Sequence, residues 1–120
     1  MVLLCLHFPD FINALCCCNV FFKSIANPFG KGVYFARDAS YALRETYSPK
    51  DANGLRYVYY ARVLVGDYTK GDSTMLVTPS KNTADPNETY DSVVDDTKDP
   101  SIFVMFKDYQ YYTEYLITFK

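Results

Sequence analysis

Two tyrosines in the stretch GKGVYFARDASYALRETY, residues 30–47, could act together on a ligand. Tyr34 lies in a glycine-bracketed run typical of a strand, and Tyr47 ends an amphipathic run typical of a short helix. Two rings on adjacent elements can form the walls of a slot for a flat, electron-poor ring. Each tyrosine taken alone is more simply explained by core packing, so the rest of the sequence has to decide.

Other groups that could do chemistry are scarce. The only histidine is His7, and the four cysteines all lie in the first eighteen residues, at Cys5, Cys16, Cys17 and Cys18. A serine triad or a cysteine–histidine pair would need that histidine. Three consecutive cysteines fit neither a disulfide framework nor a zinc motif, so we expect no metal site. The carboxylates of Asp95, Asp96 and Asp99 are expected in a solvated loop.

Composition indicates one small domain rich in strands. The chain has 120 residues, of which 49% are hydrophobic and 18% aromatic, with twelve tyrosines. Aromatic and β-branched residues favour sheet. The net charge is −2 and the basic residues are scattered, so direct binding of nucleic acid is not expected.

The first 23 residues differ from the rest. MVLLCLHFPDFINALCCCNVFF is strongly apolar, but it lacks the basic start and cleavage site of a signal peptide. Polar residues interrupt it too often for a comfortable membrane span, at His7, Asp10, Asn13 and Asn19. We therefore expect no membrane association and divide the chain into a divergent, Cys-rich segment, 1–23, and a regular domain, 24–120. The segment is either buried or foreign to the domain that follows, and a membrane or signal role is the less favoured alternative.

The regular domain reads as β-rich α+β. Apolar and alternating patterns predict strands at 32–36, 56–65, 68–70, 90–94, 102–106 and 115–119. The continuous apolar run at 102–106 predicts a central strand buried on both faces. Asp38 is a candidate cap for a helix over 39–46, and 78–89 reads as a long polar loop. Neither GxGxxG nor GxxxxGK[ST] is present, which argues against dinucleotide-binding and P-loop folds.

Three segments together carry a resemblance. GKGVYFARDASYALRETY, RYVYYARVLVGDYTKG and SIFVMFKDYQYYTEYLITF occur in this order with suitable spacing. The chain resembles, over about residues 29–120, the catalytic domain of poly(ADP-ribose) polymerase-type ADP-ribosyltransferases, and most closely the macrodomain-linked mono-ADP-ribosyltransferases. The resemblance implies a β-rich ADP-ribosyltransferase fold of two packed, mostly antiparallel sheets with a short helix. Residues 24–120 would then be a partial catalytic domain, incomplete at its N-terminal side.

The resemblance also implies a reaction. Members of this family use NAD as substrate, break its nicotinamide glycosidic bond and pass ADP-ribose to an acceptor. Their active site is described by a histidine, a tyrosine and a third residue, which is glutamate in chain-elongating members. Tyr34 matches the tyrosine and Ile102 the third position. Isoleucine cannot bind or activate a ribose hydroxyl, so the resemblance points to mono-ADP-ribosyl transfer.

Four residues are carried over as contacts for NAD: Tyr34, Tyr41, Ala42 and Tyr47. In this reading Tyr34 and Tyr47 form the two walls of a nicotinamide slot. Ala42 stands where the family has a serine that hydrogen-bonds the nicotinamide amide. The family's His-Gly pair is missing, and His7, followed by Phe8, is the only candidate for it.

The sequence therefore predicts an NAD-dependent protein mono-ADP-ribosyltransferase, a glycosyltransferase that releases nicotinamide, with NAD and an acceptor protein as partners. A nuclear or cytoplasmic location is expected from the family. One alternative is a catalytically inactive remnant of an NAD pocket that acts as an interaction module. Another is a β-rich fragment that does not fold alone, because missing strands leave sheet edges open.

Overall fold

The computed structural model describes residues 2–5 and 28–120. Seven strands dominate: β1 (Val2–Cys5), β2 (Val33–Ala36), β3 (Arg56–Val63), β4 (Tyr68–Lys70), β5 (Ser92–Val94), β6 (Ile102–Met105) and β7 (Tyr111–Phe119). Helix is limited, in the described part, to α1 (Ala39–Ala42) and the 3₁₀ turn η1 (Asp108–Gln110).

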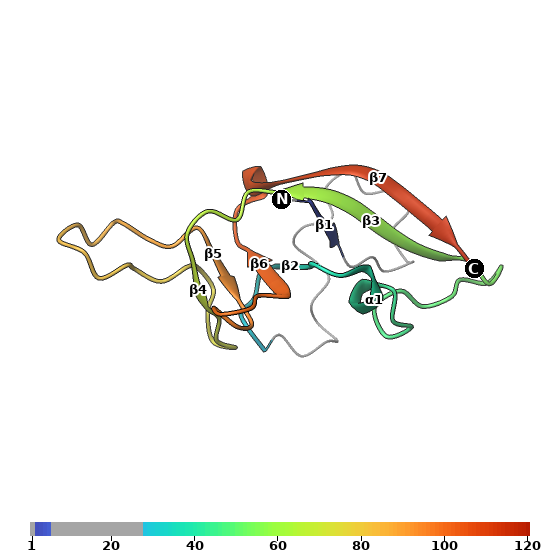
Figure 1. The fold of residues 1–120 in the computed structure, drawn as a ribbon, viewed down its shortest axis with the longest axis horizontal. Helices are drawn as coiled ribbons and strands as arrows, with labels where there is room; N and C mark the ends of the chain where they lie inside the picture. Colours follow the sequence, from blue (N-terminus) through green and yellow to red (C-terminus); the bar gives the residue numbers. More distant parts are fainter. Residues whose placement is uncertain (1, 6–27) are drawn as a thin grey trace.

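Hydrogen bonds link the strands in the order β4-β5-β6-β2-β1-β3-β7. Every neighbouring pair is antiparallel except β4 and β5. Figure 1 shows the two long strands, β3 and β7, as one ribbon pair beside the group of shorter strands, with β1 between them. Backbone pairing thus forms two groups of strands, β4-β5-β6-β2 and β3-β7, and β1 joins them.

These two groups pack on each other. One buried cluster takes Phe35, Phe103, Met105 and Val94 from the first group and Ala61 and Val63 from the second, and Tyr111 of β7 packs against it. The rings of Phe35 and Tyr111 lie 5.2 Å apart between centroids. Burial of these apolar side chains provides the main favourable free energy of the contact. The expected α+β fold, with two packed, mostly antiparallel layers of strands and little helix, is confirmed.

The central strand is also confirmed, although it ends one residue early. All four residues of β6 are buried, and β6 lies between β5 and β2 in the sheet. Phe103 and Met105 face the first cluster, and Ile102 and Val104 face a second cluster on the other side of the strand. A strand covered on both faces must be apolar throughout, which explains the sequence IFVM.

Four further expected boundaries were wrong. The last strand begins at Tyr111 rather than at residue 115, because the backbone of Tyr111–Thr113 pairs with Ala61–Val63 of β3 although the side chains there are largely exposed. The strand β3 ends at Val63 rather than at residue 65, and β5 begins at Ser92 rather than at residue 90. The helix ends at Ala42 rather than at residue 46.

Asp38 lies at the N-cap position of α1, as expected, with extended backbone angles. Its carboxylate makes no capping hydrogen bond. It instead accepts from the Arg37 guanidinium, at 3.3 Å, which also pairs with Asp99. The start of α1 is therefore defined by backbone geometry and not by a side-chain cap.

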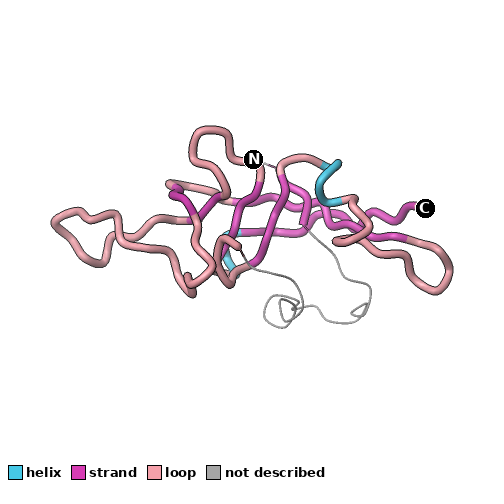
Figure 2. The backbone as a smooth tube through the Cα atoms, turned by 90° about the horizontal axis from the view of Figure 1, so that it is seen from below, coloured by secondary structure: helices cyan, strands magenta, loops and turns pink. Residues whose placement is uncertain are grey.

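The connection from β4 to β5 forms an arm that projects from one end of the molecule (Figure 2). Its two limbs are held together by the bridge between Ser80 and Thr89. Lys81 on this arm pairs with Asp67 near its base, at 2.7 Å. The predicted loop at 78–89 is confirmed as mostly irregular, and its residues 82–88 are exposed.

The predicted segment 1–23 is described only at residues 2–5, where β1 pairs with β2 and β3. Its remaining residues, including His7 and Cys16–Cys18, lie outside the described residues. Among the described residues, no helix is long and apolar enough to cross a membrane.

Candidate functional site

Tyr34 is a buried residue of β2, with 7% of its surface exposed. Its hydroxyl donates to the carbonyl oxygen of Gly30 at 2.7 Å and accepts from the backbone N–H of Phe29 at 3.2 Å. Burial raises the pKa of this hydroxyl, and the two backbone hydrogen bonds offset only part of that rise. Tyr34 therefore holds the loop that precedes β2 and stays neutral.

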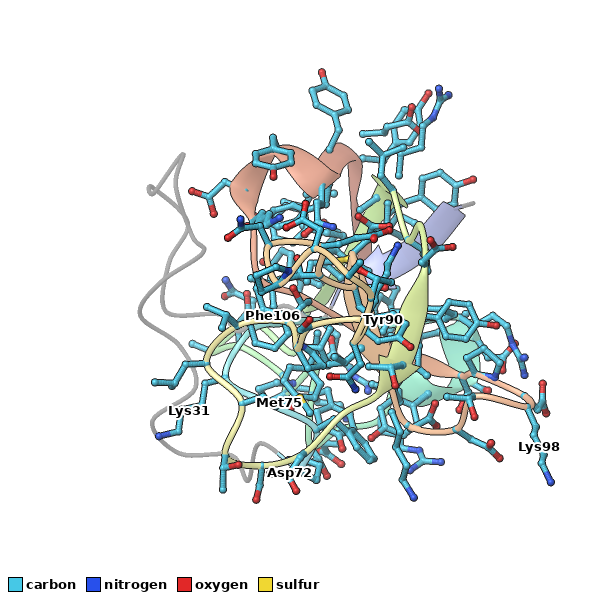
Figure 3. All side chains as sticks on the ribbon, turned by 90° about the vertical axis from the view of Figure 1, so that its left-hand side faces the viewer. Lys31, Asp72, Met75, Tyr90, Lys98 and Phe106 are labelled. Atoms are coloured by element: carbon cyan, nitrogen blue, oxygen red, sulfur yellow. The ribbon has the colours of Figure 1, made fainter. Side chains whose placement is uncertain are left out.

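Two glycines of the GKG motif allow this arrangement. Gly30 is buried with φ +131°, and a Cβ there would lie 2.9 Å from the Phe106 ring. A Cβ on Gly32 would lie 2.5 Å from the carbonyl oxygen of Met105 on β6. Only glycine fits both positions without displacing a neighbour. Figure 3 labels Met75 and Phe106, which contact the Gly30 position, and Lys31, whose N–H donates to the Met75 carbonyl.

The second buried cluster collects three of the predicted site residues. Tyr34, Ala42 and Ile102 belong to it, from β2, α1 and β6 respectively. Tyr41 packs against its edge. Residues that are far apart in sequence thus meet on the face of β2 and β6 that α1 covers.

Tyr41 and Tyr47 form a stacked pair. Their ring centroids lie 5.0 Å apart with an interplanar angle of 23°, and their hydroxyl oxygens lie 2.8 Å apart. The Arg44 guanidinium lies 4.5 Å from the centre of the Tyr41 ring, a cation–π contact. Burial and the hydrogen bond to Tyr47 raise the pKa of Tyr41 to about 12. Both tyrosines are only partly buried, so this pair borders the cluster and contacts solvent.

Asp95 is the functional candidate that the sequence pattern missed. It was expected in a solvated acidic loop, but it is partly buried beside the start of β6. Its carboxylate accepts from the N–H groups of Asp96, Ser101 and Ile102 and from the Ser101 hydroxyl. Partial burial raises the pKa of Asp95, but these four hydrogen bonds outweigh it and the pKa lies below its ordinary value. Asp95 therefore stays ionised and fixes the backbone at Ile102.

Arg56 and Ser48 were also missed. Arg56, the first residue of β3, donates to the carbonyl oxygens of Leu43 and Ser48. Ser48 is 1% exposed, and its hydroxyl donates to the Tyr57 carbonyl at 2.7 Å. The sequence does not indicate that Arg56 bonds the carbonyls of Leu43 and Ser48, because these residues precede it by 13 and 8 positions and reach it only through the folded loop between them.

The structure thus brings together Tyr34, Tyr41, Ala42, Tyr47 and Ile102, and the aromatic contact that it gives Tyr47 is with Tyr41. The slot between Tyr34 and Tyr47 stays a prediction. Ala42 is fully buried and has no hydroxyl for the amide of a ligand. In residues 2–5 and 28–120, no group of three His, Cys, Asp or Glu side chains could hold a metal ion.

Known proteins are similar to this chain in sequence. Human protein mono-ADP-ribosyltransferase PARP14 is 54% identical over 92 residues, which cover 77% of this chain and 5% of that protein. Mouse protein mono-ADP-ribosyltransferase PARP12 is 41% identical over 113 residues, covering 92% of this chain and 15% of that protein. Mouse PARP10, also named a protein mono-ADP-ribosyltransferase, is 44% identical over 92 residues, or 77% of this chain and 10% of the relative. This chain therefore spans only a small part of each of these relatives.

The family comparison covers most of the chain. The family model of the poly(ADP-ribose) polymerase catalytic domain matches residues 13–120, and the match begins inside the predicted segment 1–23. It includes all five site residues and every strand except β1. The chain therefore belongs to the poly(ADP-ribose) polymerase catalytic domain family.

Proposed function

We propose that this chain binds the nicotinamide end of NAD and transfers single ADP-ribosyl groups from NAD to a protein acceptor. One observation carries the proposal: Tyr34, Ala42 and Ile102 share one buried cluster, and the Tyr41–Tyr47 pair borders it. The family resemblance assigned Tyr34, Tyr41, Ala42 and Tyr47 to NAD and Ile102 to the third catalytic position. They come from β2, α1, the turn after α1 and β6. Membership of the family and relatives named as mono-ADP-ribosyltransferases support the same reading.

The chemistry needs orientation more than it needs a reactive side chain. The bond between the ribose carbon and the nicotinamide nitrogen breaks, and its electron pair leaves with nicotinamide, which becomes neutral. The ribose carbon passes through an oxocarbenium-like transition state, as in glycoside hydrolysis. A lone pair of the acceptor forms the new bond, and the acceptor loses its proton. In this proposal Tyr47 stacks on the nicotinamide ring and holds the bond in position for cleavage.

The third catalytic position explains why the transfer would stop at one unit. Ile102 is 5% exposed and packs in the cluster. Chain elongation needs a group that binds the hydroxyl of an ADP-ribose already attached, and an isoleucine side chain offers neither a donor nor an acceptor. Its backbone N–H is already bonded to Asp95, at 3.1 Å.

A second candidate function is an inactive interaction module that keeps the remains of this pocket. Ala42 favours it, because its methyl group replaces the hydroxyl that the family uses to bind the nicotinamide amide. The absence of a His-Gly pair from the sequence favours it too. Binding and transfer therefore have to be measured separately.

The test is a titration of the full chain with NAD, followed by amide NMR, and a transfer assay with labelled NAD. Shifts of the peaks from Tyr34, Ala42 and Tyr47 together with label on protein support the enzyme. Shifts without label support the inactive module, and no shifts at saturating NAD reject both. The variant Tyr47→Ala should abolish the shifts. Tyr109→Ala is the matched control, because Tyr109 is 75% exposed on η1.

A further inference from the structure

The short segment that carries Tyr47 is held at both ends by a single side chain. Leu43 follows α1, and Ser48 directly follows Tyr47. The Arg56 guanidinium donates through Nη2 to the Leu43 carbonyl and through Nε to the Ser48 carbonyl, at 2.7 Å for the latter. Arg56 therefore bridges the two ends of a turn that contains no regular secondary structure of its own.

The bridge lies in a segment where the backbone has already left the α-helical pattern. The Arg44 N–H donates to the Tyr41 carbonyl, three residues back, at 3.2 Å. If α1 continued, the Leu43 carbonyl would accept from the N–H of Tyr47, four residues on. Arg56 occupies that carbonyl instead, and the Tyr47 N–H donates to the Arg44 carbonyl at 3.0 Å. At Tyr47, as at Arg44, the backbone hydrogen bond therefore spans three residues instead of four. The Tyr47 ring follows this tighter backbone path.

The ring then lies on Tyr41, with centroids 5.0 Å apart. The far side of the turn is fixed to β3 a second time, because the Ser48 hydroxyl donates to the Tyr57 carbonyl and accepts from the Tyr57 N–H, at 2.7 Å and 3.2 Å. Arg56 is itself restrained, with its guanidinium 4.9 Å from the centre of the Phe119 ring. The segment that carries the Tyr47 ring is thus held by the first two residues of β3, and Arg56 is in turn held by the last residue of β7.

We infer that Arg56 is a positioning residue for Tyr47: its two hydrogen bonds to the Leu43 and Ser48 carbonyls hold the Tyr47 ring against Tyr41. The consequence for nicotinamide rests on the proposed function, in which Tyr47 is the stacking wall. Arginine suits this role because its planar fork of donors can reach two carbonyl oxygens at once. A lysine ammonium is a point donor on a flexible stem and cannot reproduce both bonds in the same plane.

The experiment compares Arg56→Met, Arg56→Lys and the control Arg62→Met in the full chain. Arg62 lies on the same strand, but its side chain is 69% exposed and pairs with Glu114 near the middle of β7. The first measurement is the nuclear Overhauser effect between the Tyr41 and Tyr47 rings, which needs no ligand. We expect it to vanish in Arg56→Met, to weaken in Arg56→Lys and to stay unchanged in Arg62→Met. An unchanged ring contact in a folded Arg56→Met, or in Arg56→Lys if Arg56→Met does not fold, overturns the inference.

The second measurement is a titration of the same proteins with nicotinamide. If the wild-type chain binds it, we expect Arg56→Met to bind about tenfold more weakly, the effect of losing charged hydrogen bonds that fix the wall. Equal affinity would overturn the link from Arg56 to the ligand. If the wild-type chain binds no nicotinamide while Arg56→Met still loses the ring contact, the proposed function fails and the positioning of Tyr47 by Arg56 stands.

Discussion

At the scale of single residues, the tyrosines of the site differ in what their hydroxyls do. The Tyr34 hydroxyl bonds two backbone groups of the preceding loop, whereas the Tyr41 and Tyr47 hydroxyls bond each other at the border of the cluster. The first therefore stabilises the fold, and the other two remain close to solvent. In the sequence, these tyrosines look alike, because each follows a short apolar or amphipathic run. The sequence pattern therefore does not distinguish the two roles.

Removing the Tyr34 hydroxyl tests the first role. In Tyr34→Phe the Gly30 carbonyl and the Phe29 N–H lose their partner inside the loop. We expect the free energy of unfolding to fall by about 1–3 kcal/mol, the cost of leaving a buried polar group unsatisfied. Urea denaturation measures it. Tyr109→Phe, at an exposed position, should change the stability by less than about 0.5 kcal/mol, and a similar loss in both variants would contradict the assigned role.

The Tyr41 hydroxyl gives a prediction in alkaline solution. Its pKa is raised to about 12 in the folded chain, while an unfolded tyrosine titrates near about 10. A raised folded pKa means that the stabilisation is complete below the unfolded value and is lost as the pH rises toward the folded value. We therefore expect wild-type stability to decrease between about pH 10 and 12, and Tyr41→Phe to lose less over the same range. Urea denaturation at several pH values in this range gives the free energy of unfolding of both proteins. An equal decrease of that free energy with pH in the wild type and in Tyr41→Phe would contradict the raised pKa.

At the scale of elements, local sequence predicted those whose own side chains are buried. Residues 102–105 form a fully buried strand because each of their side chains packs in one of the two clusters. The continuous apolar run in the sequence predicts such a strand. Residues 111–114 were missed because pairing with β3 holds them as a strand while much of their surface stays exposed. The helix was predicted too long because the backbone tightens directly after Ala42, where the Arg44 N–H donates to the Tyr41 carbonyl. The Leu43 carbonyl then accepts from Arg56, which comes from another element.

The same limit applies to the candidate site. The resemblance predicted five site residues, and the structure brings them into one region: Tyr34, Tyr41, Ala42, Tyr47 and Ile102. No pattern along the chain predicted the contact of Tyr41 with Tyr47, since both lie in one short segment whose path depends on Arg56 and Ser48. Asp95 was assigned to a solvated loop because acidic runs usually are solvated, and its four hydrogen bonds depend on the folding back of β6.

The turn between β5 and β6 gives the prediction at this scale. Asp95 is ionised in the fold, with its pKa below the ordinary value, so its stabilisation is present above about pH 4 and is lost as the pH falls through the folded pKa. Asp95→Asn should unfold more easily at neutral pH, because an amide oxygen is a weaker acceptor than a carboxylate. The difference between the two proteins should shrink in acid. Thermal melts at neutral and acidic pH measure it, with Asp96→Asn as the neighbouring exposed control, and a difference that is independent of pH would be the contrary result.

At the scale of the whole molecule, the described strands depend on β1. In the sheet order, β1 is the only strand between β2 and β3, so no other described strand joins the backbones of the two groups. The cluster around Phe35 and Phe103 also crosses from one group to the other, but by side-chain packing alone. The fold therefore depends on a short strand from the first residues of the chain, β1, which pairs on one side with the long strand β3.

Deleting residues 1–5 tests this dependence. Without β1, β2 loses its pairing partner on one side, and β3 loses the backbone bonds of four residue pairs. The backbone N–H and C=O groups of β2 and β3 that paired with β1 then lack partners, which costs free energy. Only the packing of the cluster around Phe35 and Phe103 remains to offset that cost. We expect the amide NMR spectrum to lose its dispersion and the urea transition to broaden. Replacing residues 83–87 at the exposed end of the arm with a glycine–serine turn should leave both unchanged, because this segment contributes no core residue. A dispersed spectrum after the deletion would mean that side-chain packing between the two groups is sufficient for folding, and that β1 adds to an already stable domain.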